Sequence, residues 1–256
     1  MGLLDGRVAI VTGAGTGLGL SIARSLAAEG ASIAICERDP DSGPAAAEEL
    51  RGTGVDARSY LCDMGASAQV DAAFAAARRD LGRVDILVNN AGISRVGPHT
   101  HEVTDEDWFD SIAVMQSGVF FGMRAAGRVM LDQGAGGSIV NISSIRGFSP
   151  NPGRMTYCAP KAAVIMMTQI AAGEWAGNGI RVNAIAPGIM RTPMWDADVA
   201  RGAIDEPAIV GIVPAGRIGD PREVGRLAVY LCSDDASYVT GGLFTIDGGL
   251  TSIPAA

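Results

Sequence analysis

The stretch RVAIVTGAGTGLGLSIARSLAAE, from Arg7 to Glu29, sets the architecture of this chain. Its first residues, up to Thr12, form a nearly continuous apolar run, typical of a strand that is covered on both faces of a parallel sheet. From Ser21 onward the apolar residues recur at helical spacing. The stretch therefore predicts a buried strand, a glycine-rich turn and a helix.

The glycine-rich turn predicts a phosphate site. Glycine is needed where a turn takes positive φ or where the backbone approaches another group closely. The helix that follows offers free N–H groups and the positive end of its dipole to an anion. The pattern is T-G-x-x-x-G-x-G, with Gly13, Gly17 and Gly19, and the strict G-x-G-x-x-G does not fit. The alternative is a flexible loop in a glycine-rich chain, but the position between strand and helix favours a dinucleotide.

Length, composition and charge restrict the class of protein. A chain of 256 residues with 48% hydrophobic residues is long enough to bury a sizeable core. The formal net charge of −8 argues against a nucleic-acid partner. The four cysteines lie far apart without a C-x-x-C pair, which predicts free thiols in a reducing cytosol and no metal site.

The sequence also predicts a soluble, cytoplasmic protein. Its first residues are too few and too acidic for a signal peptide. No run approaches the ~18 uninterrupted apolar residues of a membrane span.

The rest of the chain alternates strand and helix patterns, which predicts an α/β fold with a doubly wound parallel sheet in a single domain, residues 1–256. Residues 189–218 have weak periodicity and three prolines, and we expect them to form a substrate lid. Pro160 is expected in the first turn of its helix. Strands are predicted over residues 7–12, 32–36, 57–62, 84–89, 137–144, 180–186 and 242–247. Helices are predicted over residues 21–29, 44–51, 67–81, 105–130, about 156–177 and 222–231.

The end of the second predicted strand bears on the choice of cofactor. A carboxylate at Glu37 can accept both hydroxyls of an adenosine ribose and would repel a 2′-phosphate, which favours NAD over NADP. Arg38 points the other way, because an arginine can serve a 2′-phosphate, and Glu37 can also be an ordinary surface acid. The glycine turn carries Thr16 and not a basic residue, which again favours NAD. Asp63, after the third strand, can accept from the adenine amino group.

Tyr157 and Lys161 are the candidate acid–base pair, because four residues on a helix place them on one face. A phenol with a pKa near ~10 exchanges protons poorly at neutral pH. A fixed ammonium and a positive nicotinamide would lower that pKa. Ser144, at the end of the fifth strand, can donate a hydrogen bond to a carbonyl or alkoxide oxygen. The set suits hydride transfer between nicotinamide and a secondary alcohol, although Y-x-x-x-K alone also arises by chance.

Over essentially its whole length the chain resembles the short-chain dehydrogenase/reductase family. The resemblance rests on motifs in a fixed order: T-G-x-x-x-G-x-G at Thr12–Gly19, N-N-A-G at Asn89–Gly92, Ser144, Y-x-x-x-K at Tyr157–Lys161, Pro187-Gly188 with Thr192, and Asp247-Gly248-Gly249.

The resemblance implies a Rossmann-type sheet of seven parallel strands in the order 3-2-1-4-5-6-7, with helices on both faces. It also implies a Ser144–Tyr157–Lys161 catalytic centre and a homotetramer that uses the two long helices. The implied cofactor contacts are Gly13, Thr16, Gly17, Leu18, Gly19, Glu37, Arg38, Asp63, Met64, Asn90, Ala91, Gly92, Tyr157, Lys161, Pro187, Gly188, Ile189 and Thr192.

One position departs from the family. The helix after N-N-A-G usually carries an asparagine that helps to hold a water in a proton relay through the lysine, and Met115 stands there. A thioether cannot bind that water strongly, and the adjacent Gln116 faces another way. We expect slower proton exchange with bulk solvent and intact hydride transfer.

The substrate is less well indicated. Arginines in the loops at the carboxyl ends of the strands can bind an acidic group, and the alternative is that they are solvated loop residues. The candidate substrate contacts are Ser94, Arg95, Arg146, Phe148, Arg154, Met190 and Trp195. The first hypothesis for function is an NAD-dependent dehydrogenase or reductase for secondary alcohols and ketones. The alternatives are a 3-oxoacyl-thioester reductase and a weakly catalytic dinucleotide-binding protein.

Overall fold

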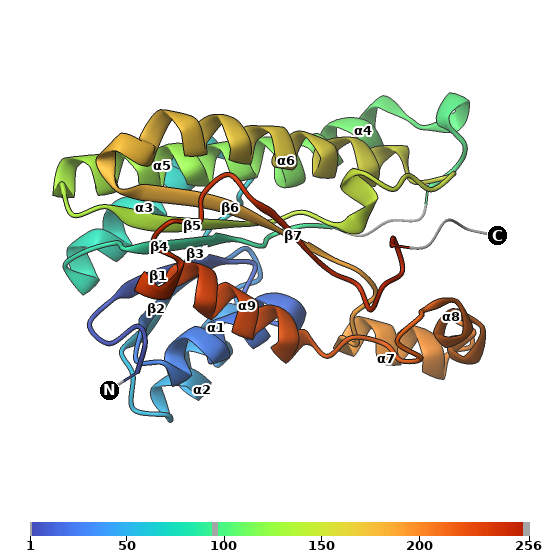
Figure 1. Ribbon diagram of the computed structural model, residues 1–256, viewed down its shortest axis with the longest axis horizontal. Helices are drawn as coiled ribbons and strands as arrows, with labels where there is room; N and C mark the ends of the chain where they lie inside the picture. Colours follow the sequence, from blue (N-terminus) through green and yellow to red (C-terminus); the bar gives the residue numbers. More distant parts are fainter. Residues whose placement is uncertain (1, 94–96, 253–256) are drawn as a thin grey trace.

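A parallel sheet lies at the centre of the computed structural model, which describes residues 2–93 and 97–252. Within those residues the sheet has seven strands in the order β3-β2-β1-β4-β5-β6-β7, which confirms the predicted order (Figure 1). The order reverses between β1 and β4, and ligands of such sheets bind at this switch point, outside the carboxyl ends of the strands. The strands are β1 (Val8–Thr12), β2 (Ser32–Glu37), β3 (Ala57–Leu61), β4 (Ile86–Asn89), β5 (Gly137–Ile142), β6 (Ile180–Pro187) and β7 (Leu243–Ile246).

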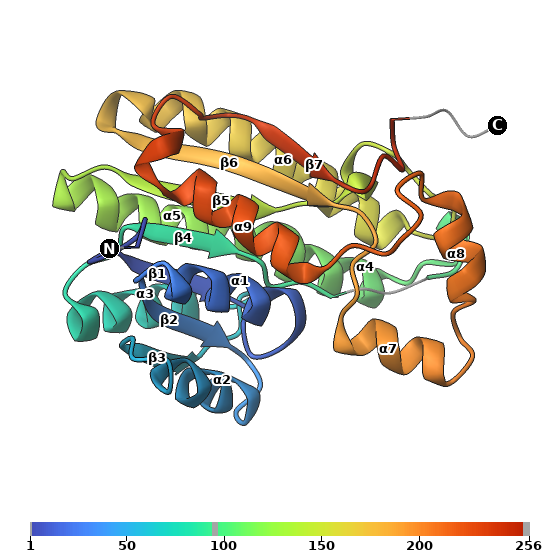
Figure 2. The same cartoon turned by 60° about the horizontal axis from the view of Figure 1, so that its bottom comes forward.

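Helices cover both faces of the sheet (Figures 1 and 2). One face is covered by α1 (Gly17–Ala28), α2 (Ser42–Arg51) and α9 (Pro221–Cys232). The other is covered by α3 (Ser67–Leu81), α5 (Gly118–Gln133) and α6 (Met155–Trp175).

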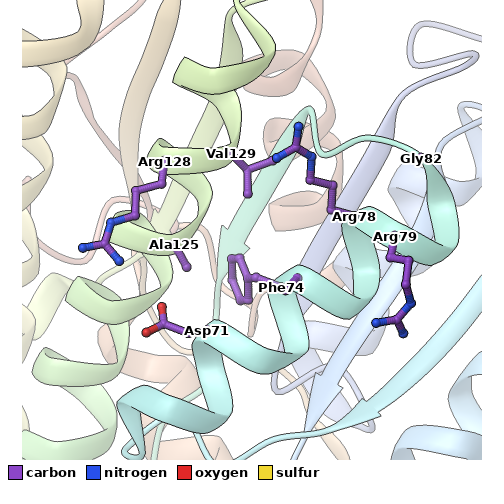
Figure 3. Close-up of a pocket in the computed structure, with 9 residues that line it drawn as sticks. Asp71, Phe74, Arg78, Arg79, Gly82, Ala125, Arg128 and Val129 are labelled. Carbon is purple, nitrogen blue, oxygen red and sulfur yellow. The ribbon is translucent and has the colours of Figure 1, made fainter.

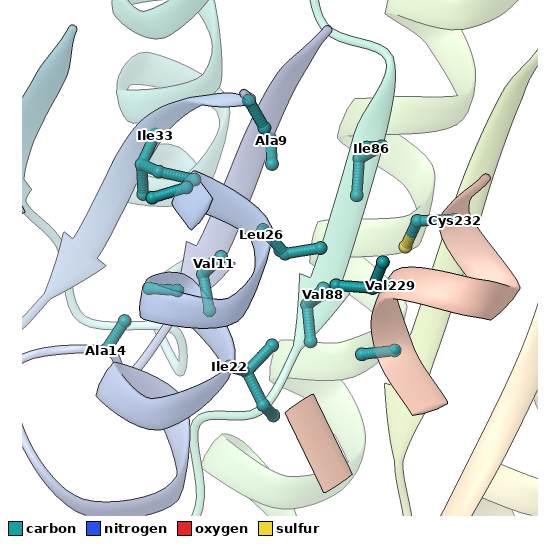
Figure 4. Packing of buried hydrophobic residues seen from close by; sticks show 14 of the residues in the cluster. Ala9, Val11, Ala14, Ile22, Leu26, Ile33, Ile86, Val88, Val229 and Cys232 are labelled. Carbon is teal, nitrogen blue, oxygen red and sulfur yellow. The ribbon is translucent and has the colours of Figure 1, made fainter. Parts of the chain in front are cut away.

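The core beneath α1 illustrates why the opening strand is apolar on both sides. Leu26 and Ile22 of α1 point toward Val11 of β1 and Val88 of β4, and Val229 of α9 closes the cluster (Figure 4). The side chains of Ile22 and Leu26 are fully buried. Burial of each such side chain stabilises the fold by ~1.5–3 kcal/mol. This packing fixes the position of the glycine turn above the sheet.

Four helices, α1, α2, α6 and α9, start before the predicted residues, and the starts of α1 and α6 matter most. Helix α1 begins at Gly17 rather than Ser21, because the glycine turn itself winds into the helix. Helix α6 begins at Met155, so Pro160 lies in its second turn, and the predicted first-turn position is wrong. The cause is Arg154, whose carbonyl accepts hydrogen bonds from the N–H groups of Tyr157 (3.0 Å) and Cys158 (2.8 Å) and so starts the helix earlier.

The single helix predicted over residues 105–130 is interrupted. Helix α4 (Asp105–Ile112) passes into a π-helical segment (Ala113–Ser117) and then into α5. Such segments carry one extra residue per turn and are frequent at functional sites. Met115, the residue that departs from the family, lies in this segment and is buried.

The segment from residue 189 to 218 holds two short helices, α7 (Pro193–Ala200) and α8 (Glu206–Ile212), beyond the carboxyl ends of the strands (Figure 2). Each starts with a side-chain cap and a proline in the first turn. These local signals of a helix start are not visible in the hydrophobic periodicity, which is weak in this segment. In the described part of the chain, no helix is both long and apolar enough to cross a membrane.

Candidate active site

The glycine turn is bound to the end of β4 by hydrogen bonds. The Thr12 hydroxyl oxygen accepts from the backbone N–H groups of Asn90 and Ala91, both at 3.0 Å. The side-chain amide of Asn90 donates to the carbonyl oxygens of Thr12 and Gly13, also at 3.0 Å. The N-N-A-G motif therefore holds the turn in place.

Two glycines of the turn have different physical roles. A Cβ on Gly19 would lie 2.2 Å from the Gly13 carbonyl oxygen and 2.4 Å from the Asn90 amide nitrogen, so only glycine fits. Gly17 has a φ of +57°, and a Cβ there would meet no atom within 4 Å. Space is thus left at the N-terminus of α1, where no acidic residue lies in the first turn. The turn fits the phosphates of a dinucleotide, with Thr16 exposed and Leu18 packed on the core.

Glu37 lies beside this turn. One carboxylate oxygen accepts from the Gly15 N–H (3.1 Å), and the other accepts from the N–H groups of Arg38 (2.9 Å) and Asp39 (3.2 Å). A carboxylate has about four acceptor positions, so Glu37 keeps capacity for a ribose hydroxyl.

Beyond β3, the Asp63 carboxylate accepts from the Gly65 N–H at 2.8 Å, and the buried Met64 supports α5. A Cβ on Gly118 of α5 would lie 3.0 Å from the Met64 carbonyl oxygen.

Ser144, Tyr157 and Lys161 come together at the carboxyl end of β5. Ser144 is buried, and its hydroxyl oxygen accepts from the Arg146 N–H at 3.1 Å. The Ser144 hydroxyl lies near enough to the Tyr157 hydroxyl to lower the pKa of the phenol. The buried Lys161 ammonium donates to the Ile142 carbonyl oxygen at 2.7 Å and lies 5.8 Å from the centre of the Tyr157 ring.

Burial dominates the acid–base properties of this group. It raises the pKa of Tyr157, while the Ser144 hydroxyl and the charges of Arg154 and Arg146 lower it. The sequence suggested a lowered pKa in the presence of both the ammonium and a positive nicotinamide, and the protein groups alone do not offset the cost of burying a phenolate. Burial also lowers the pKa of Lys161 to about 8.

Met115 and Lys161 both approach Gly92. A Cβ built on Gly92 would lie 3.7 Å from Met115 Cγ and 3.8 Å from Lys161 Nζ, so the thioether side chain and the amine border the same point. Among the described residues the ammonium has one hydrogen-bond acceptor, the Ile142 carbonyl.

The candidate residues after β6 are held by the chain's last strand and by α7. A Cβ on Gly188 would lie 2.7 Å from Asp247 Cβ, which explains the pairing of the Pro187-Gly188 and Asp247-Gly248-Gly249 motifs. Thr192 caps α7 by accepting from the Trp195 N–H at 3.3 Å. The Ile189 carbonyl accepts from the Gly219 N–H at 3.0 Å.

Among the substrate candidates, Met190 and Trp195 have structural partners. The Met190 side chain packs on the core beside Gly219. The Trp195 indole N–H donates to Glu206 at 3.3 Å, and Glu206 also binds Arg191, so this acid joins α7 to α8. Glu206 was not predicted from the sequence, because its partners, Arg191 before α7 and Trp195 within it, lie 15 and 11 residues away along the chain.

Arg146 and Arg154 adjoin the catalytic group, and Phe148 is exposed in the same loop. Ser94 and Arg95 lie outside the described residues. In the described ranges no group of His, Cys, Asp and Glu side chains could hold a metal ion.

A hollow of about 660 Å³ lies between α3 and α5, away from all of these residues (Figure 3). Phe74 forms its floor, and Arg78, Arg79 and Arg128 surround it. It contains none of the predicted site residues. A second hollow of about 430 Å³ includes Thr192 at the start of α7.

Known proteins resemble this chain over nearly its whole length. A family model described as enoyl-(acyl carrier protein) reductase matches residues 13–251. A D-threitol dehydrogenase from Mycolicibacterium smegmatis is 38% identical over 97% of this chain and 94% of its own. A galactitol 2-dehydrogenase (L-tagatose-forming) from Cereibacter sphaeroides is 42% identical over 97% of this chain and 96% of its own.

Solved structures are equally similar. A short-chain type dehydrogenase/reductase from Mycobacterium marinum has a TM-score of 0.90 and 36% identity, covering 98% of this chain and 97% of that one. A gluconate 5-dehydrogenase from Burkholderia cenocepacia, in complex with NADP and tartrate, has a TM-score of 0.91 and 38% identity, covering 98% of this chain and 97% of that one.

Proposed function

Since the chain belongs to the short-chain dehydrogenase/reductase family, we propose that it is an NAD-dependent dehydrogenase of secondary alcohols, with Tyr157 as the acid–base group. The observation that carries the proposal is the cluster of Ser144, Tyr157 and Lys161 at the carboxyl end of β5, beside the switch point of the sheet. The relatives named above act on polyols, which supports an alcohol substrate.

The three side chains divide the work on the substrate oxygen. Ser144 donates a hydrogen bond to that oxygen, and Tyr157 takes the hydroxyl proton as a carbon–oxygen double bond forms. The carbinol hydrogen leaves with its electron pair, and the nicotinamide ring, when bound, supplies the hydride acceptor. Because burial raises the pKa of Tyr157, the phenolate needs the positive charges around it.

Glu37 supports the choice of NAD. Its carboxylate lies beside the glycine turn, bonded to the Gly15 N–H, where an adenosine ribose would extend from the phosphates. A 2′-phosphate about 4 Å away would be repelled by ~1 kcal/mol in water and by ~4 kcal/mol in a protein-like medium. Since 1.4 kcal/mol corresponds to a factor of ten, we expect kcat/KM to favour NAD at least tenfold.

The test measures initial rates with a panel of polyols, secondary alcohols and 3-hydroxyacyl thioesters, each with NAD and with NADP. We expect NAD reduction with at least one polyol and its loss, by at least ~10²-fold, in Tyr157→Phe. Tyr60→Phe is the matched control, because Tyr60 lies on β3 and bonds to Asp80. Turnover with NADP alone would overturn the choice of cofactor, and tight NADH binding without any turnover would favour a binding protein.

A further inference from the structure

Two arginines flank the proposed catalytic group from different elements. Arg146 follows Ser144 by two residues, and its backbone N–H donates to the Ser144 hydroxyl oxygen at 3.1 Å. The turn that carries it packs on α6, because a Cβ on Gly147 would lie 2.8 Å from the Lys161 carbonyl oxygen. Arg154 lies at the start of α6, and its carbonyl accepts from the Tyr157 N–H at 3.0 Å.

Neither guanidinium has an acidic partner among the described residues. The Arg146 side chain donates to the Ser149 carbonyl oxygen at 3.2 Å, and the Arg154 side chain has no hydrogen bond or ion pair there. Most other arginines of the chain pair with Asp or Glu, as in Arg24–Glu49 and Arg217–Glu223. The chain has more acidic than basic residues, so composition does not explain the lack of partners.

The surroundings of Arg146 and Arg154 make it costly to leave their charges without an acidic partner. Both arginines are only partly exposed, and the charges of both oppose the rise in the pKa of Tyr157 that burial causes. Arg154 also places a cation at the positive end of a helix dipole, where an anion would be favoured. The buried Lys161 ammonium adds a third positive charge. Three cations near one phenol, none of them paired with a carboxylate of the described residues, are complementary to an anionic ligand.

We propose that the substrate is a polyhydroxy acid whose carboxylate binds to Arg146 and Arg154 while a nearby secondary hydroxyl faces Ser144 and Tyr157. This inference rests on the proposed function and names its substrate class. A guanidinium binds a carboxylate through two parallel N–H groups. A phosphate fits less well, because the N–H groups of Tyr157 and Cys158 are already bonded to the Arg154 carbonyl and offer no backbone cradle.

The kinetic test compares aldonates with the alditols of the same length and configuration, such as gluconate and glucitol, with NAD. We expect wild-type kcat/KM to be at least tenfold higher for the acid. Arg146→Gln and Arg154→Gln should each lower the ratio of kcat/KM for the acid to kcat/KM for the alditol at least tenfold, mainly by raising KM for the acid. Arg146→Lys and Arg154→Lys should keep part of this preference for the acid. The control is Arg128→Gln, because Arg128 of α5 is exposed and forms no ion pair with the described residues, and this variant should leave the ratio unchanged.

A binding test separates this inference from the proposed function. Calorimetry with NADH present measures tartrate against threitol, which share four carbons and differ in their terminal carboxylates. Tartrate binding that is at least tenfold weaker in Arg154→Gln supports the anion site even if no alcohol is oxidised. Preference for the alditol, preference for a sugar phosphate, or equal losses for acid and alditol would overturn it. Equal losses would mean that the arginines act on the pKa of Tyr157 and not on a substrate carboxylate. The proposed function would then be unaffected.

Discussion

At the scale of single residues, Met115 makes the most specific prediction. Burial lowers the pKa of Lys161 to about 8, and Met115 beside it offers no strong acceptor. An asparagine carbonyl there would stabilise the ammonium and raise that pKa. If catalysis requires the protonated lysine, wild-type kcat/KM falls above about pH 8. In Met115→Asn we expect this fall at higher pH, by ~0.5–1 unit, in initial rates measured from pH 6 to 10.

Met115→Leu is the control for that substitution, because it keeps the apolar volume without adding an acceptor. Its pH profile should superimpose on that of the wild type. An unchanged profile in Met115→Asn would contradict both the lysine titration and the relay that the sequence suggested.

The roles of single side chains were predictable from the sequence where a motif of fixed spacing points to one chemical role. Ser144, Tyr157 and Lys161 were predicted as a group, and the structure brings them together. The raised pKa of Tyr157 was not predictable, because it depends on burial by residues from several elements. The pairing of Arg191 with Glu206 was hidden for the same reason, since fifteen residues and a helix boundary separate the partners.

At the scale of elements, the close contact between the glycine turn and α1 predicts a loss of stability. A methyl group on Gly19 would clash with the Gly13 carbonyl and the Asn90 amide. We expect Gly19→Ala to lower the free energy of unfolding by about 1–3 kcal/mol and to weaken NADH binding. Urea denaturation and a fluorescence titration with NADH measure the two effects.

Gly177→Ala serves as the comparison, because a Cβ at Gly177 meets no atom within 4 Å. It should unfold and bind NADH like the wild type. Wild-type stability and NADH affinity in Gly19→Ala would show that the turn does not approach α1 this closely.

The elements themselves were predictable where hydrophobic periodicity was strong, as in α3 and in the strands. The prediction failed where a local hydrogen bond outweighs the pattern. Arg154 starts α6 early and moves Pro160 into the second turn. The π-helical segment around Met115 and the capped helices α7 and α8 leave no periodic signal that a window of residues could detect.

At the scale of the whole molecule, the strand order followed from the family's motifs, which the sequence carries in order. Alternating strands and helices alone predict a doubly wound sheet and leave its strand order open. The order β3-β2-β1-β4-β5-β6-β7 places the glycine turn, the N-N-A-G motif and Ser144 on neighbouring strands, β1, β4 and β5. Residues distant in sequence therefore share one edge.

The outer surface of α5 and α6 predicts how molecules associate. Helix α6 buries Val164 and Ala171 against the sheet, yet Met166 and Ile170 on its other side are 57% and 54% exposed. A helix that is apolar all round is normally covered on all sides. On α5, Phe120 is 46% exposed, and Figure 1 shows both helices along one outer face. We propose that a second copy of the chain covers this face.

We expect the wild type to be a tetramer and the Ile170→Glu variant to form dimers. In a two-fold contact the substitution occurs once on each chain, so two carboxylates would be buried in one apolar interface. Size-exclusion chromatography with light scattering at micromolar concentration measures the mass. Ile212→Glu is the matched control, since Ile212 is 59% exposed and belongs to α8, a helix that lies apart from α5 and α6 (Figure 1). A monomeric wild type, or an Ile170→Glu variant of wild-type mass, would exclude this face as the contact. Alcohol oxidation by the dimer would further show that this contact is not needed for activity, as expected if Ser144 after β5 and Tyr157 and Lys161 of α6 form the site within one chain.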